Sequence, residues 1–214
     1  NTAITTLTGA VGTVDRVSIT GALTTGAAIT SAESLTVTGV TILGGNVTTT
    51  GSVGQVYTGL VTNNIAGDGP LTLTAAGTAG VNIGTGGYTG DAQNLNIAGN
   101  LNLDGNIVAT AAVDVSGNAS LDGDITTVGA GTITIDGTTT LVSDTTLTTT
   151  GDAITLTGAV SGDFDLIVAT GGNTAIVTLT GAVGTVDAMH ITGRLDTGAA
   201  ITSAESLTVT GVTI

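Results

Sequence analysis

Apolar and polar residues alternate along this chain in short runs, and most runs end in Thr-Gly or Asp-Gly. The Thr-Gly runs are Thr5–Gly9, Val17–Gly21, Leu35–Gly39, Ile154–Gly158 and Val177–Gly181, and the Asp-Gly runs are Leu101–Ile107, Ala119–Ile125 and Thr132–Thr138. Alternation with period two predicts β-strands that pack on one side and face water on the other. The glycine that follows predicts a corner, with a positive φ at the glycine and a side-chain hydrogen bond from the neighbouring Asp or Thr. No segment shows a sustained helical spacing, and the single proline, Pro70, follows Gly-Asp-Gly in a predicted turn.

The strands recur every ten to twenty residues without a connection long enough for a helix. The strings GNLNLDGNI and GNASLDGDI lie 18 residues apart, and the LTGAV runs at Leu156 and Leu179 lie 23 apart. This rhythm predicts an all-β parallel β-solenoid with coils of about 20 residues, in which each strand stacks on its equivalent in the next coil. We expect Val on Val and Ile on Ile inside and Thr on Thr outside. With a step of ~4.8 Å per coil, 172 residues advance the rod by roughly 40 Å.

A tandem of β-sandwich domains, each about a hundred residues long, is the alternative all-β interpretation. A sandwich core normally contains several large aromatic residues, whereas this chain has three: Tyr57, Tyr88 and Phe164. The chain also lacks a linker-like stretch between two halves. Both observations favour the solenoid.

Residues 1–42 return as residues 173–214, with 36 of the 42 positions identical. Self-similarity at a fixed offset, here 172 residues, is typical of a tandem array. We therefore expect residues 1–214 to form one continuous solenoid, with residues 1–172 as one repeat unit and 173–214 as the start of the next copy. Such an array favours a structural role, because a catalytic site has little reason to recur along a rod.

The six differences between the two copies predict which side of a strand is packed. They are Thr5/Val177, Arg16/Ala188, Val17/Met189, Ser18/His190, Ala22/Arg194 and Thr24/Asp196. Val17 is replaced by another apolar residue, whereas its neighbours Arg16 and Ser18 change without any shared chemistry. We therefore expect Val17 and Ile19 to face the interior, and Arg16 and Ser18 to face water.

Composition supports a folded, acidic rod. Thr and Gly make up 83 of the 214 residues, about 39%, but Ile, Leu, Val and Phe still make up 27%, above the roughly 20% below which chains tend to be disordered. The net charge is −14, with two arginines and no lysine, which argues against nucleic-acid binding and favours solubility. There is no cysteine to form a disulfide or a thiolate metal site. No apolar stretch approaches the ~20 residues of a membrane span, so we expect no membrane insertion.

Paired acidic residues are the candidate metal ligands. Asp122 with Asp124 and Asp163 with Asp165, together with the related pair Asp104 and Asn106, offer the hard oxygen ligands that Ca²⁺ prefers. The calcium-binding nonapeptide pattern GGxGxDxUx is absent, however, and Asp-Gly is also ordinary corner chemistry. Calcium is therefore a weak candidate cofactor, and the sequence predicts no other.

The remaining polar residues do not assemble into a catalytic motif. The lone histidine, His190, occupies a position that holds Ser18 in the other copy, and Arg16 and Arg194 have no basic counterparts. No nucleophile–base pair or phosphate-binding loop is present, so we expect no enzyme activity. Asn46 and Asn118 begin N-glycosylation sequons.

Several strings resemble the repeats of giant bacterial surface proteins of the filamentous-haemagglutinin and autotransporter-passenger type. They are LTLTAAGTAGVNIG (Leu71–Gly84), GNLNLDGNI, TGDAITLTGAV (Thr150–Val160) and LTVTGV. The resemblance covers essentially the whole chain in style and composition and identifies no site. It implies a right-handed parallel β-helix outside the cell, exported as an unfolded chain, which suits a protein without cysteine. It also implies a role in adhesion, biofilm or surface structure.

We therefore predict an extracellular structural protein, the shaft of a filament or giant surface fibre. Neither end of the sequence looks like the polar cap that a solenoid needs, so we expect another coil to abut each end and the chain to associate with itself, end to end and laterally. An adhesin stalk is the alternative, for which Thr62–Pro70 and Gly84–Gln93 are modest candidate insertions. Ice binding by outward Thr rows is a third hypothesis, disfavoured by the variable coil spacing.

Overall fold

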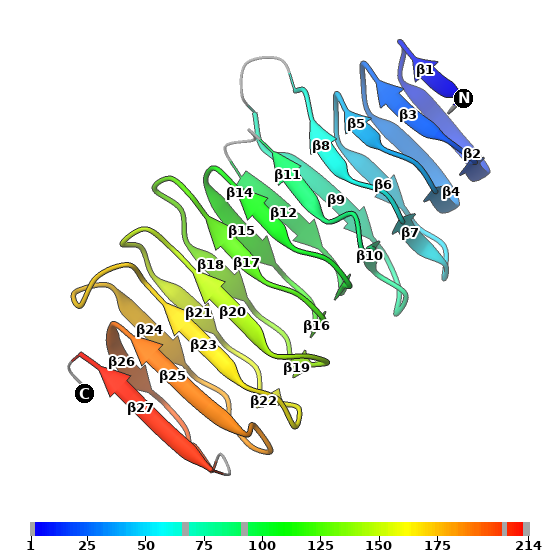
Figure 1. Cartoon of the computed structure of the whole chain (residues 1–214). Coiled ribbons are helices and arrows are strands. Elements are labelled where there is room, and N and C mark those ends of the chain that lie inside the picture. The colour runs from blue at the N-terminus through cyan, green and yellow to red at the C-terminus, as the bar shows by residue number, and fades with distance from the viewer. Residues whose placement is uncertain (1–2, 66–68, 91–93, 203–204, 212–214) are drawn as a thin grey trace.

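The fold is a rod of stacked coils, with the first and last described strands at opposite ends (Figure 1). The computed structural model describes residues 3–65, 69–90, 94–202 and 205–211, and these contain strands but no helix. All strand pairs are parallel, and each strand pairs with the equivalent strands of the coils before and after it. The predicted all-β parallel solenoid is confirmed.

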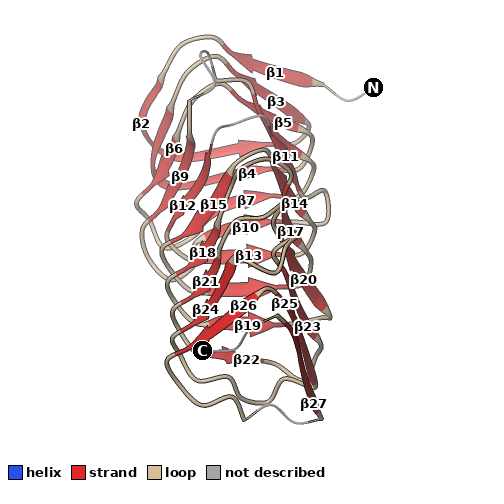
Figure 2. Cartoon of the chain, turned by 90° about the vertical axis from the view of Figure 1, so that its left-hand side faces the viewer, coloured by secondary structure: helices blue, strands red, loops and turns tan. Residues whose placement is uncertain are grey.

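Each coil contributes strands to three faces, which we call A, B and C. In Figure 2 the strands of face A and those of face B run down opposite sides of the rod, with those of face C between them. Face A contains β1 (Ile4–Leu7), β3 (Ala22–Thr25), β5 (Thr41–Leu43), β8 (Val61–Asn63), β11 (Tyr88–Gly90), β14 (Ile107–Ala109), β17 (Ile125–Thr127), β20 (Thr145–Thr148), β23 (Leu166–Ala169), β25 (Ala188–Thr192) and β27 (Ser206–Thr210).

Faces B and C are joined into a single sheet by strands that bend around their common corner. Face B contains β6 (Val47–Thr49), β9 (Leu71–Ala75), β12 (Asn94–Ala98), β15 (Ala112–Val115), β18 (Ile133–Ile135), β21 (Ile154–Leu156), β24 (Ile176–Leu179) and β26 (Arg194–Thr197). Face C contains β7 (Gly54–Tyr57), β10 (Val81–Ile83), β13 (Leu101–Leu103), β16 (Ala119–Leu121), β19 (Thr139–Leu141) and β22 (Val160–Ser161). The bending strands are β2 (Val11–Ile19) and β4 (Ile29–Val37); the first half of β4 pairs with β6 and its second half with β7.

The inward residues follow a spacing of six that the sequence analysis did not detect. Buried residues at this spacing lie on faces B, C and A in turn. They are Leu95, Leu101, Ile107, Val113, Ala119 and Ile125. Three sides of six residues make a coil of 18, so that Ile107 stacks on Ile125 and Leu101 on Ala119. The elementary unit of this fold is therefore a six-residue side.

Longer coils keep these sides and place their extra residues at corners. The longest spacing on face A is between Val61 and its partner Tyr88, 27 positions further on. The predicted insertions at Thr62–Pro70 and Gly84–Gln93 both fall in or next to this coil; residues 66–68 and 91–93 lie outside the described residues. Coil length therefore varies without disturbing the stacking of the faces.

The two copies of the repeated segment lie on different faces of the rod. β1 and β3 of the first copy lie on face A, whereas their counterparts β24 and β26 lie on face B. The second half of β4 lies on face C, whereas its counterpart β27 lies on face A. Pairing inside each copy is nevertheless the same, since Ile4 pairs with Ala22 and Ile176 with Arg194. Eight coils separate β1 from β23 on face A, and β24 lies one side further, so the 172-residue offset corresponds to eight and one third turns.

The core consists mainly of stacked Leu, Ile and Val side chains, as predicted. Val17 and Ile19 pack partly against it and Met189 and Ile191 are buried, whereas Ser18 and His190 are exposed, which confirms the predicted sides of these strands. The long coil also contains two buried tyrosines, whose hydroxyl groups donate to polar partners. Tyr57 donates to Gln55 Oε1 at 2.9 Å and Tyr88 to Asn63 Oδ1 at 3.0 Å.

The expectation that threonine lies only outside is wrong. Several threonines are buried, among them Thr127, Thr145 and Thr170. Their hydroxyl groups donate to main-chain carbonyl oxygens at corners, for example Thr127 to Gly131 O at 2.7 Å and Thr145 to Ser143 O at 3.1 Å. A buried hydroxyl group is tolerated when it is hydrogen-bonded, and a corner carbonyl provides the acceptor.

The predicted positive φ at the Asp-Gly corners is also wrong. Gly105, Gly123 and Gly137 are not among the residues with positive φ. These glycines are needed because a Cβ would collide with the backbone of the preceding coil: on Gly137 it would lie 2.5 Å from Gly117 O. The corners therefore select glycine because successive coils approach closely there.

Burial predicts that neighbouring residues of β16 differ sharply in their contribution to stability. Leu121 is fully buried and stacks between Leu103 and Leu141, so Leu121→Ala should lower the free energy of unfolding by about 2–5 kcal/mol. Ser120 points outward on the same strand, and Ser120→Ala should change it by less than about 0.5 kcal/mol. Urea unfolding of both variants checks this, and equal effects would contradict the assigned inward and outward sides.

Candidate functional site

Asn and Asp side chains at the corners bind the backbone of the next coil. At the corner between faces B and C, Asn100 Oδ1 accepts from Asn118 N and Asn118 Oδ1 accepts from Thr138 N, each at 2.9 Å. At the corner between faces C and A, Asp124 Oδ1 accepts from Thr146 N at 2.7 Å and Asp144 Oδ1 from Asp165 N at 3.0 Å. These side chains therefore hold successive coils together where the strand ladder is interrupted.

The calcium candidates lie at the same corner, between faces C and A, but in separate coils. Asp122 and Asp124 precede β17, Asp163 and Asp165 precede β23, and the coil with Asp144 lies between them. Asp122, Asp163 and Asp165 are exposed, and Asp124 is occupied by its bond to Thr146 N. Among the described residues, no three Asp, Glu or His side chains are grouped as a metal site would require. The structure thus places the candidates along one edge without bringing them together.

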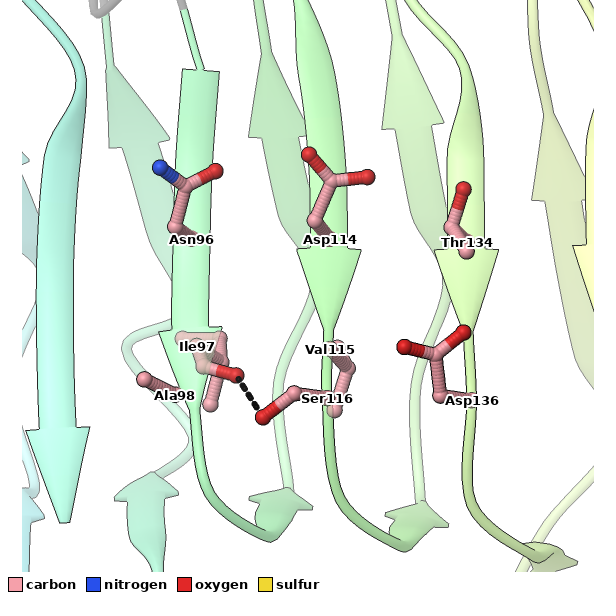
Figure 3. A pocket seen from close by; sticks show the side chains of 8 residues that line it. All are labelled: Asn96, Ile97, Ala98, Asp114, Val115, Ser116, Thr134 and Asp136. Carbon is pink, nitrogen blue, oxygen red and sulfur yellow. Dashed lines mark hydrogen bonds between the residues drawn. The ribbon is translucent and has the colours of Figure 1, made fainter.

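A shallow depression of about 220 Å³ lies on the outer side of face B. Its floor is a row of outward residues on adjacent strands, Asn96, Asp114 and Thr134, and the next row toward the corner includes Ser116 and Asp136 (Figure 3). Ser116 Oγ donates to Ile97 O at 3.5 Å. The depression thus presents two carboxylates beside neutral hydrogen-bonding groups, and its lining contains no basic residue.

Asp114 is the titratable group that this depression perturbs. Partial burial raises the pKa of its carboxyl group, a hydrogen bond with Thr134 lowers it, and the neighbouring charge of Asp136 raises it, with a net upward shift. The sequence analysis did not identify this pair. Its signal was present in the 18- and 20-residue spacings that stack Asn96 on Asp114 and Asp114 on Thr134.

The other polar candidates from the sequence are scattered over the surface. His190 is exposed and stacks beside Ile167 on face A. Arg16 Nη2 lies 3.9 Å from Glu33 Oε2, and both side chains are more than half exposed, so this ion pair contributes little to stability. Asn46 and Asn118, the sequon residues, are exposed at corners, where their Oδ1 atoms accept main-chain N–H groups.

The terminal coils expose residues that are buried in the other copy of the same sequence. Leu207 in β27 is 45% exposed, whereas its counterpart Leu35 in β4 is 0% exposed. At the opposite end, Leu7 and Val11 are partly buried, whereas their counterparts Leu179 and Val183 are at most 1% exposed. The inner copy is covered on both sides by further coils, and this cover accounts for the difference.

Comparison with protein-family models, curated proteins and solved structures gave no significant match to this chain. The described residues include no helix long and apolar enough to cross a membrane. The features that bear on function are therefore the corners, the depression on face B and the two ends of the rod.

The raised pKa of Asp114 predicts how a substitution there changes stability with pH. Because the pKa of the folded state lies above the ordinary value near 3.8, stability falls as the pH rises through the interval between these two values and stays lower above it. Asp114→Asn removes the cost of the charged form, so it should raise the melting temperature at neutral pH and lose this gain in acid. Thermal unfolding of Asp163→Asn, which also removes one negative charge, is the control and should show no comparable gain.

Proposed function

We propose that this chain is part of the shaft of an extracellular filament or giant cell-surface fibre. In this role the chain is mechanical and not enzymatic, and it is continued at its ends by further coils of the same kind. The parallel ladders support this proposal, because they run through the described coils from β1 to β27 without a break into separate domains.

The observation that carries the proposal is the exposure of Leu207. Residues Gly26–Ile42 and Gly198–Ile214 have identical sequences, yet Leu35 is fully buried under β7 and Leu207 is 45% exposed. A sequence that forms a covered interior in one copy offers the same apolar residues and unpaired strand edge in the other. Such an end favours association with another coil.

Charge and composition support a long soluble shaft over a laterally sticky one. The net charge of −14 disfavours uncontrolled side-by-side bundling. The absence of cysteine and the resemblance to exported repeat proteins support a location outside the cell. Ice binding is not favoured, because the outward Thr row of face B is interrupted at Asn96, Asp114 and Asp196.

Charge introduced at the exposed end should block end-to-end growth. Leu207→Lys places a cation on the end surface, where burial without a partner is costly, and should weaken self-association at least about tenfold. Thr208→Lys adds the same charge on the outward side of β27 and should leave association nearly unchanged. Sedimentation velocity over a range of concentrations measures both, with circular dichroism to verify the fold. A wild-type chain that stays monomeric at high concentration contradicts the proposal.

A further inference from the structure

The repeated sequence indicates which coil fits the C-terminal end of the rod. The outermost groups there are β26 on face B, Ile201 on face C and β27 on face A. Their counterparts in the first copy are β3, Ile29 and the second half of β4. These are covered by β5, β6 and β7, the coil formed by residues 41–57.

The contacts made by this coil in the first copy are available again at the end. Leu35 and Val37 pair with Gln55 and Tyr57, and Leu207 and Val209 offer the same two side chains at the same spacing. Ile29 N donates to Asn46 O at 2.9 Å, and Ile201 is its counterpart. A coil with the sequence of residues 41–57 therefore matches both the apolar residues and the strand register of the end.

Charge also favours this coil as the partner. Residues 41–57 contain no charged side chain, so bringing this segment onto a chain of net charge −14 adds no local repulsion at the joint. A cover rich in carboxylates, such as residues 163–187, lacks this advantage.

We propose that the C-terminal end is covered by residues 41–57 of a second copy of the repeat, which enters one face further round the rod than in the first copy. The cover then lies on faces B, C and A, where the first copy places it on faces A, B and C. This inference rests on the proposed shaft function and adds the partner segment and the rotation at the joint. Successive copies turn by a third of a turn, so each outward feature recurs on a different side about 40 Å along the axis, at ~4.8 Å per coil, and returns to its first side after three copies.

The rotation is tested within single molecules by engineered disulfides, because the chain has no native cysteine. Ile167 and His190 are stacked, outward residues of adjacent strands on face A, and neighbouring strands are close enough for a disulfide. The Ile167→Cys/His190→Cys variant should therefore form an intramolecular disulfide on mild oxidation. Without the rotation, His190 would follow Ser161 on face C, so Ser161→Cys/His190→Cys should stay reduced.

Two further pairs keep this test decisive. Thr178→Cys/Asp196→Cys lies within one copy and should cross-link with or without the rotation, which verifies the oxidation conditions. Thr155→Cys/Thr178→Cys joins the second copy to β21 on face B and provides an independent measure of the rotation if the first variant does not fold. Cross-linking of Ser161 with His190 in place of Ile167 with His190 overturns the rotation.

The covering segment is tested with a synthetic peptide of residues 41–57 that carries Cys at the position of Val56. Thr36 pairs with Val56 in the first copy, so this peptide should form a disulfide with the full chain carrying Thr208→Cys, the counterpart position. A control peptide with an additional Val47→Lys substitution loses an inward residue and should cross-link several-fold less. Equal yields from both peptides, or none from either, overturn the proposed cover.

The rotation and the shaft function fail in distinguishable ways. If Ile167 and His190 cross-link but the chain never self-associates, the rotation stands and the shaft does not. If the chain assembles through its end but Ser161 is the partner of His190, the shaft stands and the rotation does not.

Discussion

The parallel backbone ladder between successive coils is the interaction on which the rest of this structure depends. Hydrogen bonds such as Ile107 N to Asp124 O, at 2.8 Å, join one coil to the next. Backbone groups left unpaired in a packed interior are costly, so a coil is stable only between neighbours that match its register. Identical or similar side chains are thereby stacked at fixed positions, and stability becomes a sum of contacts between adjacent coils.

This constraint acts on the sides much more strongly than on the corners. The faces keep their stacking even across the 27-residue spacing from Val61 to Tyr88. The corners, by contrast, absorb extra residues and need only short local solutions, such as Asn118 accepting the N–H of Thr138 or Gly137 making room for the backbone of Gly117. Variation in coil length is therefore compatible with a continuous core.

Much of the fold was predictable because alternation and internal repetition are direct consequences of the ladder. The sides of Val17 and Ser18 followed from comparing two copies. The spacing of six was missed because inward positions also hold Thr41, Thr139 and Gln55, which do not look apolar in the sequence. Buried hydroxyl groups of this kind are satisfied by contacts, such as Gln55 Nε2 with Thr74 O at 2.8 Å, that only the folded chain reveals. The Asp114–Asp136 pair was missed because its two residues meet only through stacking across coils of unequal length.

The position of the second copy shows that the three faces are interchangeable. β1 and β24 have nearly the same sequence and keep the same pairing within their copies, yet they lie on faces A and B. This is possible because every side presents two inward positions in the same geometry, so a segment makes equivalent contacts on any face. A repeat in such a rod must contain a whole number of sides but not a whole number of turns. The offset here spans 25 sides, since eight coils of three sides are followed by one more. Because 25 is not divisible by three, rotation between copies follows from the arithmetic of the coil and needs no special residues at the joint.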